Sequence, residues 1–390
     1  MSFISIGTAT QALFGEGSRN ELVRLPGIVD GAKVLVLASS SAMCRPRVCK
    51  LVHELSEFAN VMTWEVVRPN PRIVDIEACR EKYQDQGFTH IVGIGGGSTL
   101  DQAKATAMAL YCNADIKSLL ALKTPLPKRS NKLVLLPTTS GTGAEMSFGA
   151  ILTDCSSGEK LSLRGHNLAA DYALVDPELT WGTPVELSMV TGFDILTHAL
   201  ETWVSTAATP YTRDLSRSAI ERVFRWLPAL YDNADDTIAR YELSYASMVM
   251  GINLALSTTC LPHRLQYPVG AATDTEHAAG LAAIYPAWLD HVLPYADMKL
   301  SECADWIEPV WDLPTTSDRA WAFVQAVKKL LRRINLTPSL QDLGVTCEMI
   351  KCFPLEVKGR LDTDPSYRGI NDIEVIYNNA FSAASAKSAY

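Results

Sequence analysis

Four residues in this chain have side chains whose types could together hold a metal ion. Asp194 and His198 lie four residues apart in GFDILTHALE (192–201). On a helix, residues with this spacing share a face, so both side chains can reach one point. His263 and His277 lie fourteen residues apart, which is not the spacing of a histidine pair on one helical turn. A buried Asp–His pair by itself is more often a structural hydrogen bond than a metal site.

All four residues together offer one carboxylate and three imidazoles, a competent ligand set for a divalent cation. The stretch between the two histidines contains Pro268 and Gly270. We expect this Pro/Gly-containing stretch to bring two ligands from separate helix ends to the same ion. The sequence therefore predicts a metal site made of Asp194, His198, His263 and His277.

A second kind of chemistry is indicated by a glycine run in THIVGIGGGSTLDQAKATA (89–107). Gly95, Gly96 and Gly97 follow an apolar run and let backbone approach a ligand without a Cβ clash. The helix expected after Ser98 would point its free N–H groups and its positive dipole end at that ligand. The run is neither GxGxxG nor a Walker A loop, and a tight turn without a ligand is the alternative.

A second loop strengthens the prediction of a nucleotide site. LPTTSGTGAE (136–145) also follows an apolar run and offers the hydroxyl groups of Thr138, Thr139, Ser140 and Thr142. In open α/β sheets, strand ends of this kind meet at the carboxyl edge, where nucleotides bind. The residues predicted to bind the nucleotide are Ser39, Ser40, Asn70, Gly95, Gly96, Gly97, Ser98, Asp101, Thr138, Thr139, Thr142 and Lys160.

The elements that must position these residues fall into two parts. Apolar runs at 33–39, 61–67, 90–98 and 132–139 alternate with helix-like segments, which predicts a doubly wound, mostly parallel α/β sheet. After about residue 180 the apolar spacing is helical, so the second part is expected to be all-α. We expect a dinucleotide-binding domain over 1–180 and a metal-binding domain over 181–390. The last residues of the chain, SAASAKSAY, are expected to be a solvated or frayed helix end.

Composition limits the partners of the chain. Its 390 residues are 47% hydrophobic and 20% charged, with a net charge of −8. We therefore expect neither nucleic acid nor a membrane as a partner. A small anionic substrate is not excluded, because a single Arg can bind one. The nine cysteines are scattered, and no secretion signal is recognised, so reduced thiols in a cytoplasmic protein are expected.

Together these motifs resemble the iron-dependent (group III) alcohol dehydrogenase family. The resemblance rests on GIGGGSTLDQAK, LPTTSGTGAE, ALVDPEL and GFDILTHALE, followed by the spaced His263 and His277. It implies a nucleotide-binding α/β domain, a helical domain and a cleft between them, the fold shared with dehydroquinate synthase. It also implies a homodimer, and Fe(II) bound by the four residues named above, with Zn(II) as a substitute.

The chain departs from the family pattern near His263. Many members have a further histidine four residues after this ligand, where this chain has Tyr267. A phenol is a poorer proton shuttle than an imidazole near neutrality, and packing is the alternative role. Arg264 could hold a carboxylate, phosphate or phosphonate of the substrate, or it could pair with an acid such as Glu276. We expect a small aldehyde as substrate, with an anionic one such as phosphonoacetaldehyde as a candidate, and predict catalytic roles for Tyr267 and Arg264.

The expected cofactor is NADPH rather than NADH. In this family an acidic residue that selects NAD ends the strand predicted at 33–39, whereas here that position is Ser39, followed by Ser40 and Ser41. Small hydroxyl residues leave room for a 2′-phosphate, and Arg45 is a nearby cation. The serines could instead simply cap the next helix.

Two other functions compete with this interpretation. Lyases of the dehydroquinate synthase type also bind NAD and a divalent metal, but their ligands are a Glu and two His. A non-catalytic NADP-binding regulator is the second alternative, and the full ligand set argues against it.

Overall fold

The computed structural model describes residues 6–29, 31–122, 124–307 and 313–382. The chain divides into two compact units, Met1–Thr183 and Pro184–Tyr390, and each is described by itself. Residues 383–390 of the expected frayed tail lie outside the described residues.

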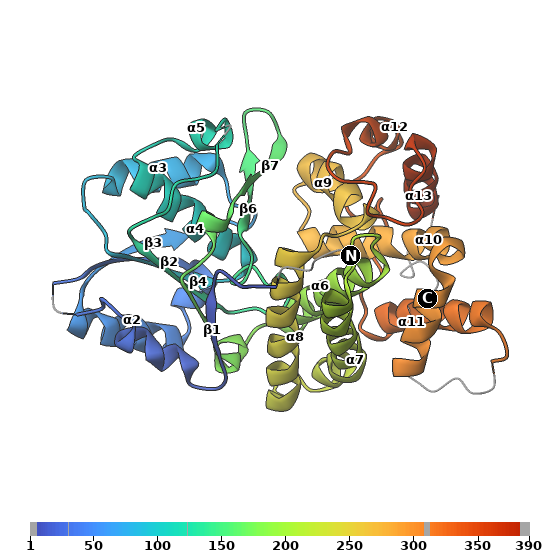
Figure 1. The fold of residues 1–390 in the computed structure, drawn as a ribbon, viewed down its shortest axis with the longest axis horizontal. Helices are drawn as coiled ribbons and strands as arrows, with labels where there is room; N and C mark the ends of the chain where they lie inside the picture. Colours follow the sequence, from blue (N-terminus) through green and yellow to red (C-terminus); the bar gives the residue numbers. More distant parts are fainter. Residues whose placement is uncertain (1–5, 30, 123, 308–312, 383–390) are drawn as a thin grey trace. The chain divides into compact units, whose positions relative to one another are not determined.

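The first unit is built on a six-stranded parallel sheet in the order β1-β8-β5-β4-β2-β3 (Figure 1). All four runs expected to be strands fall on it. Its strands are β1 (Gln11–Phe14), β2 (Lys33–Ser39), β3 (Asn60–Val66), β4 (His90–Gly95), β5 (Lys132–Pro137) and β8 (Tyr172–Val175). A separate antiparallel hairpin, β6 (Gly149–Asp154) and β7 (Glu159–Arg164), was not predicted.

Helices cover both faces of this sheet. They are α1 (Ser40–Met43), α2 (Pro46–Phe58), α3 (Ile73–Tyr83), α4 (Gly97–Cys112) and α5 (Ile116–Leu120), with short 3-10 helices at Ser18–Arg24, His166–Leu168 and Pro177–Thr180. In β2, Val34 and Val36 pack with α2, while Leu35 and Leu37 pack on the opposite face with α3 and α4. Burial on both faces explains the unbroken apolar run, so the doubly wound α/β prediction is confirmed.

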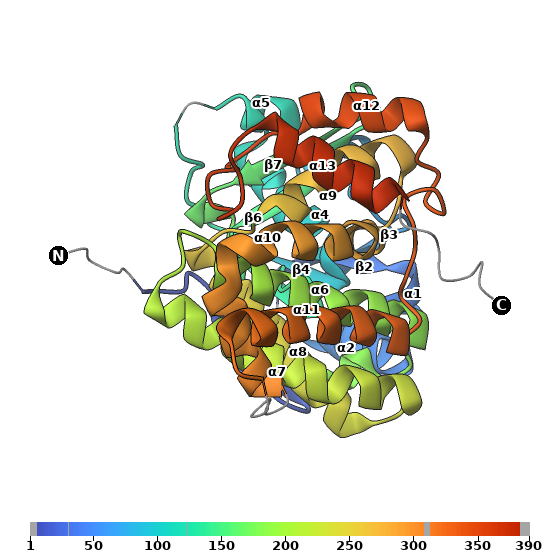
Figure 2. The ribbon, with the colours of Figure 1, turned by 90° about the vertical axis from the view of Figure 1, so that its right-hand side faces the viewer.

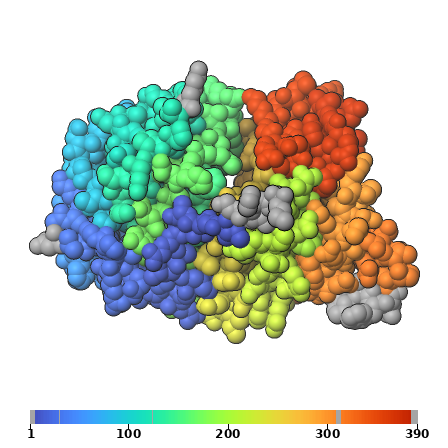
Figure 3. All heavy atoms as spheres, in the orientation of Figure 1, coloured from blue at the N-terminus to red at the C-terminus, as the bar shows by residue number. Residues whose placement is uncertain are grey.

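The second unit is helical throughout its described part. Its helices are α6 (Val185–Val204), α7 (Pro210–Asp232), α8 (Thr237–Leu256), α9 (Leu261–Thr273), α10 (His277–Ile307), α11 (Thr316–Arg333), α12 (Cys347–Glu356) and α13 (Ile370–Ser382). α10 contacts α6, α9, α11 and α13, and Figure 2 shows α9 and α13 on one side of it and α11 on the other. The C-terminal segment that contains α12 and α13 forms one continuous surface region, red in Figure 3.

One apolar core fills this helical unit, with Phe193 of α6 and Tyr285 of α10 meeting edge to face. Apolar side chains surround most of α6, so polar residues such as Asp194, His198 and Glu201 are buried and must find partners. Among the described residues, no helix is long and apolar enough to cross a bilayer.

Candidate functional site

α6 carries two of the predicted ligands on its buried side. Asp194 is 2% exposed and His198 is 5% exposed. Their four-residue spacing places Nε2 of His198 3.8 Å from Oδ1 of Asp194. The helical geometry expected from the sequence is therefore present for this pair.

The other two predicted ligands lie at the starts of two consecutive helices. His263 is the third residue of α9, and His277 is the first residue of α10. Pro268 and Gly270 do not form the connection, because both lie within α9. The chain reverses instead after Asp274, whose φ of 51° is left-handed. The expectation that these two residues form the connection was wrong, because α9 continues through Pro268 to Thr273 despite the N–H that this proline lacks.

The structure brings three of the four predicted ligands into one group, and His198 lies beside it. One ligand atom each of Asp194, His263 and His277 lies within 4.8 Å of the others. The rings of His198 and His263 stack, with centroids 4.7 Å apart, and those of His263 and His277 are 5.2 Å apart.

This geometry suits a divalent cation. Nε2 of His263 is buried without a hydrogen-bond partner and lies 4.0 Å from Oδ1 of Asp194. An imidazole nitrogen without a hydrogen-bond partner and a carboxylate oxygen are both ligands for a divalent metal, and a metal bound between them would give the buried nitrogen a partner. The four residues therefore fit the metal that the sequence predicts.

Electrostatics favour the protonation states that a metal requires. Burial raises the pKa of Asp194, but the charges of His198, His277 and His263 outweigh it, so the pKa lies below its ordinary value. Burial, followed by the charge of His198, holds the pKa of His263 well below its ordinary value. An ionised carboxylate and a neutral imidazole are the forms that bind metal.

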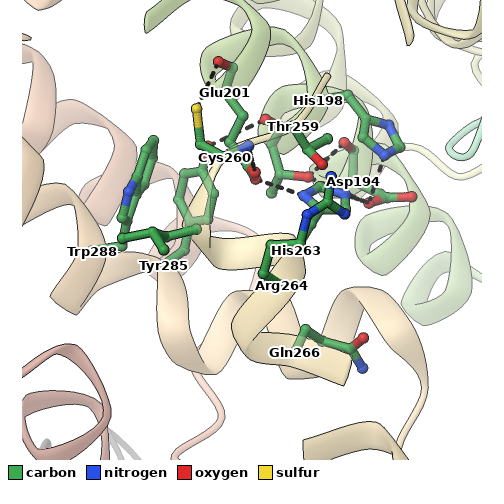
Figure 4. Close-up of polar contacts among 12 residues, drawn as sticks. Asp194, His198, Glu201, Thr259, Cys260, His263, Arg264, Gln266, Tyr285 and Trp288 are labelled. Carbon is green, nitrogen blue, oxygen red and sulfur yellow. Dashed lines mark hydrogen bonds and ion pairs between the residues drawn. The ribbon is translucent and has the colours of Figure 1, made fainter. Parts of the chain in front are cut away.

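Two buried residues that sequence reasoning missed hold the far sides of the histidine rings. Glu201 Oε1 lies 2.7 Å from Nδ1 of His263 (Figure 4), and Gln266 Oε1 lies 2.6 Å from Nδ1 of His277. Burial raises the pKa of Glu201 to about 8, against the hydrogen bond from the Cys260 N–H; a cation in the site would lower it again. The available signal was spacing, since Glu201 follows Asp194 by seven residues and shares its helix face.

Tyr267 and Arg264 lie beside this cluster. The Tyr267 ring stacks near the His277 ring, with centroids 6.3 Å apart, and its hydroxyl group accepts a hydrogen bond from Arg264 at 3.4 Å. Arg264 is 8% exposed and also donates to Thr258, while its Nε is buried without a partner. Among the described residues, the pairing of Arg264 with Glu276 that the sequence left open does not occur.

The predicted nucleotide residues gather at the carboxyl edge of the parallel sheet. Gly95 ends β4, Gly96 caps α4, and Gly97 begins it. The second loop follows β5, the neighbouring strand, and the Thr138 N–H donates to the Gly95 carbonyl at 2.9 Å. A Cβ on Gly97 would lie 2.6 Å from Cγ2 of Thr142, and one on Gly96 would lie 3.3 Å from Oγ1 of Thr139. The two loops thus leave no room for larger side chains here.

A third group of predicted nucleotide residues meets at the same helix start. The Asn70 N–H donates to the Ser98 hydroxyl group at 3.3 Å, and Lys160 of β7 donates to Oδ1 of Asn70 at 3.1 Å. Asp101 is held within the chain, where it accepts from the Ile151 N–H and pairs with Lys104. Its predicted contact with the nucleotide stays a prediction.

Ser39 and Ser40 lie at the end of β2, next to β4. The Ser39 side chain caps α1 by accepting from the Ala42 N–H at 3.2 Å. The Arg45 guanidinium donates to the carbonyls of Thr138 and Leu179 and to the Thr183 hydroxyl group. Arg45 therefore links the segments that follow β5 and β8 within the first unit.

Known proteins match nearly the whole chain. Residues 9–177 match the family model for iron-containing alcohol dehydrogenase, and residues 188–380 match that for the C-terminal part of the Fe-containing alcohol dehydrogenase family. Choline dehydrogenase of Bacillus subtilis (strain 168) is 27% identical over 314 residues, which cover 80% of this chain and 78% of that protein.

Two further matches agree with the family models. The probable alcohol dehydrogenase EutG of Escherichia coli (strain K12) is 30% identical over 283 residues, or 73% of this chain and 70% of that protein. A crystal structure of 1,3-propanediol oxidoreductase superposes with a TM-score of 0.89 at 24% identity, covering 97% of this chain and 100% of the other. At that identity the structural likeness supports the fold alone.

Removing one predicted ligand should abolish metal binding and spare nucleotide binding. Asp194→Ala and His263→Ala each delete a donor in the helical unit, whereas the glycine loop belongs to the other unit. Metal content by mass spectrometry and NADPH binding by fluorescence check this, with the exposed His53→Ala as the control. Retained metal with full activity in either ligand variant would contradict the four-ligand arrangement.

Filling the space between the two loops should weaken nucleotide binding. In Gly97→Ala the new methyl group meets Thr142, and such overpacking costs about 1–3 kcal/mol. We expect the Kd for the nucleotide to rise about tenfold or more while metal content stays unchanged. Gly7→Ala is the control, since nothing lies within 4 Å of its Cβ. Unchanged nucleotide affinity in Gly97→Ala would show that this loop is no part of the nucleotide site.

Proposed function

Because this chain belongs to the iron-containing alcohol dehydrogenase family, we propose that it transfers a hydride between NADPH and a small aldehyde or alcohol at a divalent metal ion. The observation that carries the proposal is the close group of ligand atoms from Asp194, His263 and His277, with an orphaned imidazole nitrogen in it and His198 beside it. Fe(II) is the metal that the family implies, with Zn(II) as a substitute that such ligands bind well. Membership of this family also argues against the two alternative functions, a lyase of the dehydroquinate synthase type and a non-catalytic NADP-binding regulator.

Each group has a separate task in the proposed reaction. A divalent ion in the site would polarise the carbonyl oxygen as a Lewis acid, and the nicotinamide would supply the hydride. Asp194 and the three imidazoles hold the ion, while Glu201 and Gln266 fix the orientation of His263 and His277. The Tyr267 hydroxyl group is proposed to hold or pass the proton of the alcohol.

The nucleotide would bind at the carboxyl edge of the sheet. The N-terminus of α4 and its glycines offer N–H groups to the pyrophosphate, and the hydroxyl groups after β5 offer further donors. Ser39 lies on the strand beside β4 and carries no charge that would repel a 2′-phosphate. These features support NADPH as the preferred cofactor.

Arg264 supports an anionic aldehyde as the substrate. Its guanidinium is buried and forms no ion pair among the described residues, and it contacts Tyr267, which stacks near His277. A buried cation with an unused N–H donor favours a carboxylate, phosphate or phosphonate on the substrate. Phosphonoacetaldehyde is one such compound. The relatives are named for choline and 1,3-propanediol, so their names do not select a class.

The substrate class can be tested with a panel of aldehydes under anaerobic conditions with Fe(II). We expect NADPH oxidation with anionic aldehydes, phosphonoacetaldehyde and succinic semialdehyde among them, at lower KM than with butyraldehyde. Arg264→Gln removes one charge-assisted contact worth roughly 1.5–3 kcal/mol, so KM should rise about tenfold or more for anionic aldehydes alone. Arg264→Lys keeps the charge and should lose less. Equal damage with neutral and anionic aldehydes would show that Arg264 only supports the fold, and no turnover of any aldehyde would contradict the proposed function.

Cofactor preference can be reversed at one position. Ser39→Asp places a negative charge at the end of β2, while Asp caps a helix as well as Ser does, so α1 should persist. We expect kcat/KM for NADPH to fall at least about tenfold and that for NADH to change much less. Ser56→Asp is the matched control. Ser56 lies near the end of α2, just before the start of β3, so the same charge is added at the amino ends of the strands rather than at their carboxyl ends. A wild-type preference for NADH, or an unchanged cofactor ratio in Ser39→Asp, would rule the idea out.

A further inference from the structure

Glu201 is a fully buried carboxyl group that binds the start of α9 with both of its oxygens. It lies on α6, one turn after His198, and is 0% exposed. Its Oε2 accepts a hydrogen bond from the Cys260 N–H at 2.8 Å, and its Oε1 lies 2.7 Å from Nδ1 of His263 (Figure 4). Glu201 therefore holds both the backbone at the start of α9 and the imidazole of His263.

The contact determines which nitrogen of His263 faces the other ligands. Because Oε2 already accepts from a backbone N–H, Oε1 of the ionised carboxylate, the form that a cation in the site favours, is left to accept from Nδ1–H. Nε2 then carries the lone pair, is buried without a partner, and points at Asp194. The neighbouring His198 ring, stacked at 4.7 Å, keeps the imidazole from turning over freely.

The second histidine of this pair is held differently. Nδ1 of His277 contacts the amide oxygen of Gln266, which is a neutral acceptor. A carboxylate acceptor raises the basicity of the imidazole it holds more than an amide does, and such partners typically matter about 10- to 100-fold for metal affinity. The two contacts thus differ in charge although they are alike in geometry.

We propose that Glu201 is a positioning residue of the metal site, whose carboxylate fixes the tautomer and orientation of His263 and so strengthens binding of a divalent cation. The inference rests on the metal site of the proposed function. Glu201 acts through His263, and no contact with substrate or cofactor is assigned to it.

Glu201→Gln tests the role of the carboxylate with little change of shape. If the amide oxygen faces His263, the amide NH₂ meets the Cys260 N–H. If the oxygen faces Cys260, the NH₂ meets Nδ1 and forces the imidazole proton onto Nε2, which then cannot bind metal. In either orientation an acceptor is lost, so we expect the affinity for Co(II) to fall about 10- to 100-fold.

Asp364→Asn is the matched control. Asp364 is also buried and caps the same helix end, because its Oδ2 accepts from the Leu261 N–H at 3.1 Å and from Nε1 of Trp288 at 2.8 Å. Among the described residues it contacts no histidine. Its loss should lower the thermal stability of the metal-free protein but leave Co(II) affinity within about threefold of wild type.

The measurements are thermal unfolding of the metal-free chains and titration with Co(II) alone, followed by its visible absorption. Weak Co(II) binding in Glu201→Gln, with near wild-type binding in Asp364→Asn, supports the proposal. Wild-type affinity in Glu201→Gln, or equal losses in both variants, overturns it. If wild type itself binds no Co(II), the proposed metal site fails instead.

Glu201→Asp provides a second test that does not depend on the Gln variant folding. It keeps the charge but is one methylene group shorter, so its carboxylate cannot reach both Cys260 and His263. We expect it to bind Co(II) more weakly than wild type and more tightly than Glu201→Gln. Wild-type affinity in Glu201→Asp would overturn the positioning role.

Discussion

The hydrogen bond between Glu201 and His263 is the interaction on which the helical unit's site most depends. α6 places Asp194, His198 and Glu201 along one buried face, and the last of these holds the first turn of α9. Without that contact, Nε2 of His263 would have no fixed direction. The stacked rings of His198 and His263 would then no longer both direct a nitrogen toward Asp194. The arrangement leaves Nε2 of His263 and Nδ1 of His198 buried without hydrogen-bond partners, and the first of these, which faces Asp194, is costly unless a cation binds there.

The nucleotide-binding unit meets a steric requirement rather than an electrostatic one. Its two loops approach so closely that Cβ atoms on Gly97 and Gly96 would lie 2.6 Å from Thr142 and 3.3 Å from Thr139. Glycine there lets the N-terminus of α4 face a ligand at the edge of the sheet. At the neighbouring end of β2, the Ser39 side chain caps the start of α1. A helix cap and the absence of charge are thus supplied by the same small residue.

The sequence predicted those parts of the fold that depend on local patterns. Unbroken apolar runs became buried parallel strands, and Asp194 and His198 share a helix face because their spacing requires it. The turn between His263 and His277 was misplaced, because Pro268 and Gly270 are strong turn formers locally but lie within α9. Glu201 was not singled out, since its role exists only through the distant His263. Arg45, named as a nearby cation for a phosphate, donates to carbonyl groups of the segments after β5 and β8, contacts that no local pattern indicates.

X-ray absorption of the Zn(II)-loaded chain is the measurement that tests most directly whether these four side chains form one metal site. The arrangement predicts one zinc per chain, with three imidazole nitrogens at about 2.0–2.1 Å and one carboxylate oxygen at about 2.0–2.2 Å. The multiple-scattering signal of imidazole should correspond to three histidines and should fall to two in His263→Ala. A coordination shell containing sulfur, or one with fewer than three imidazoles in the wild-type chain, would contradict the account.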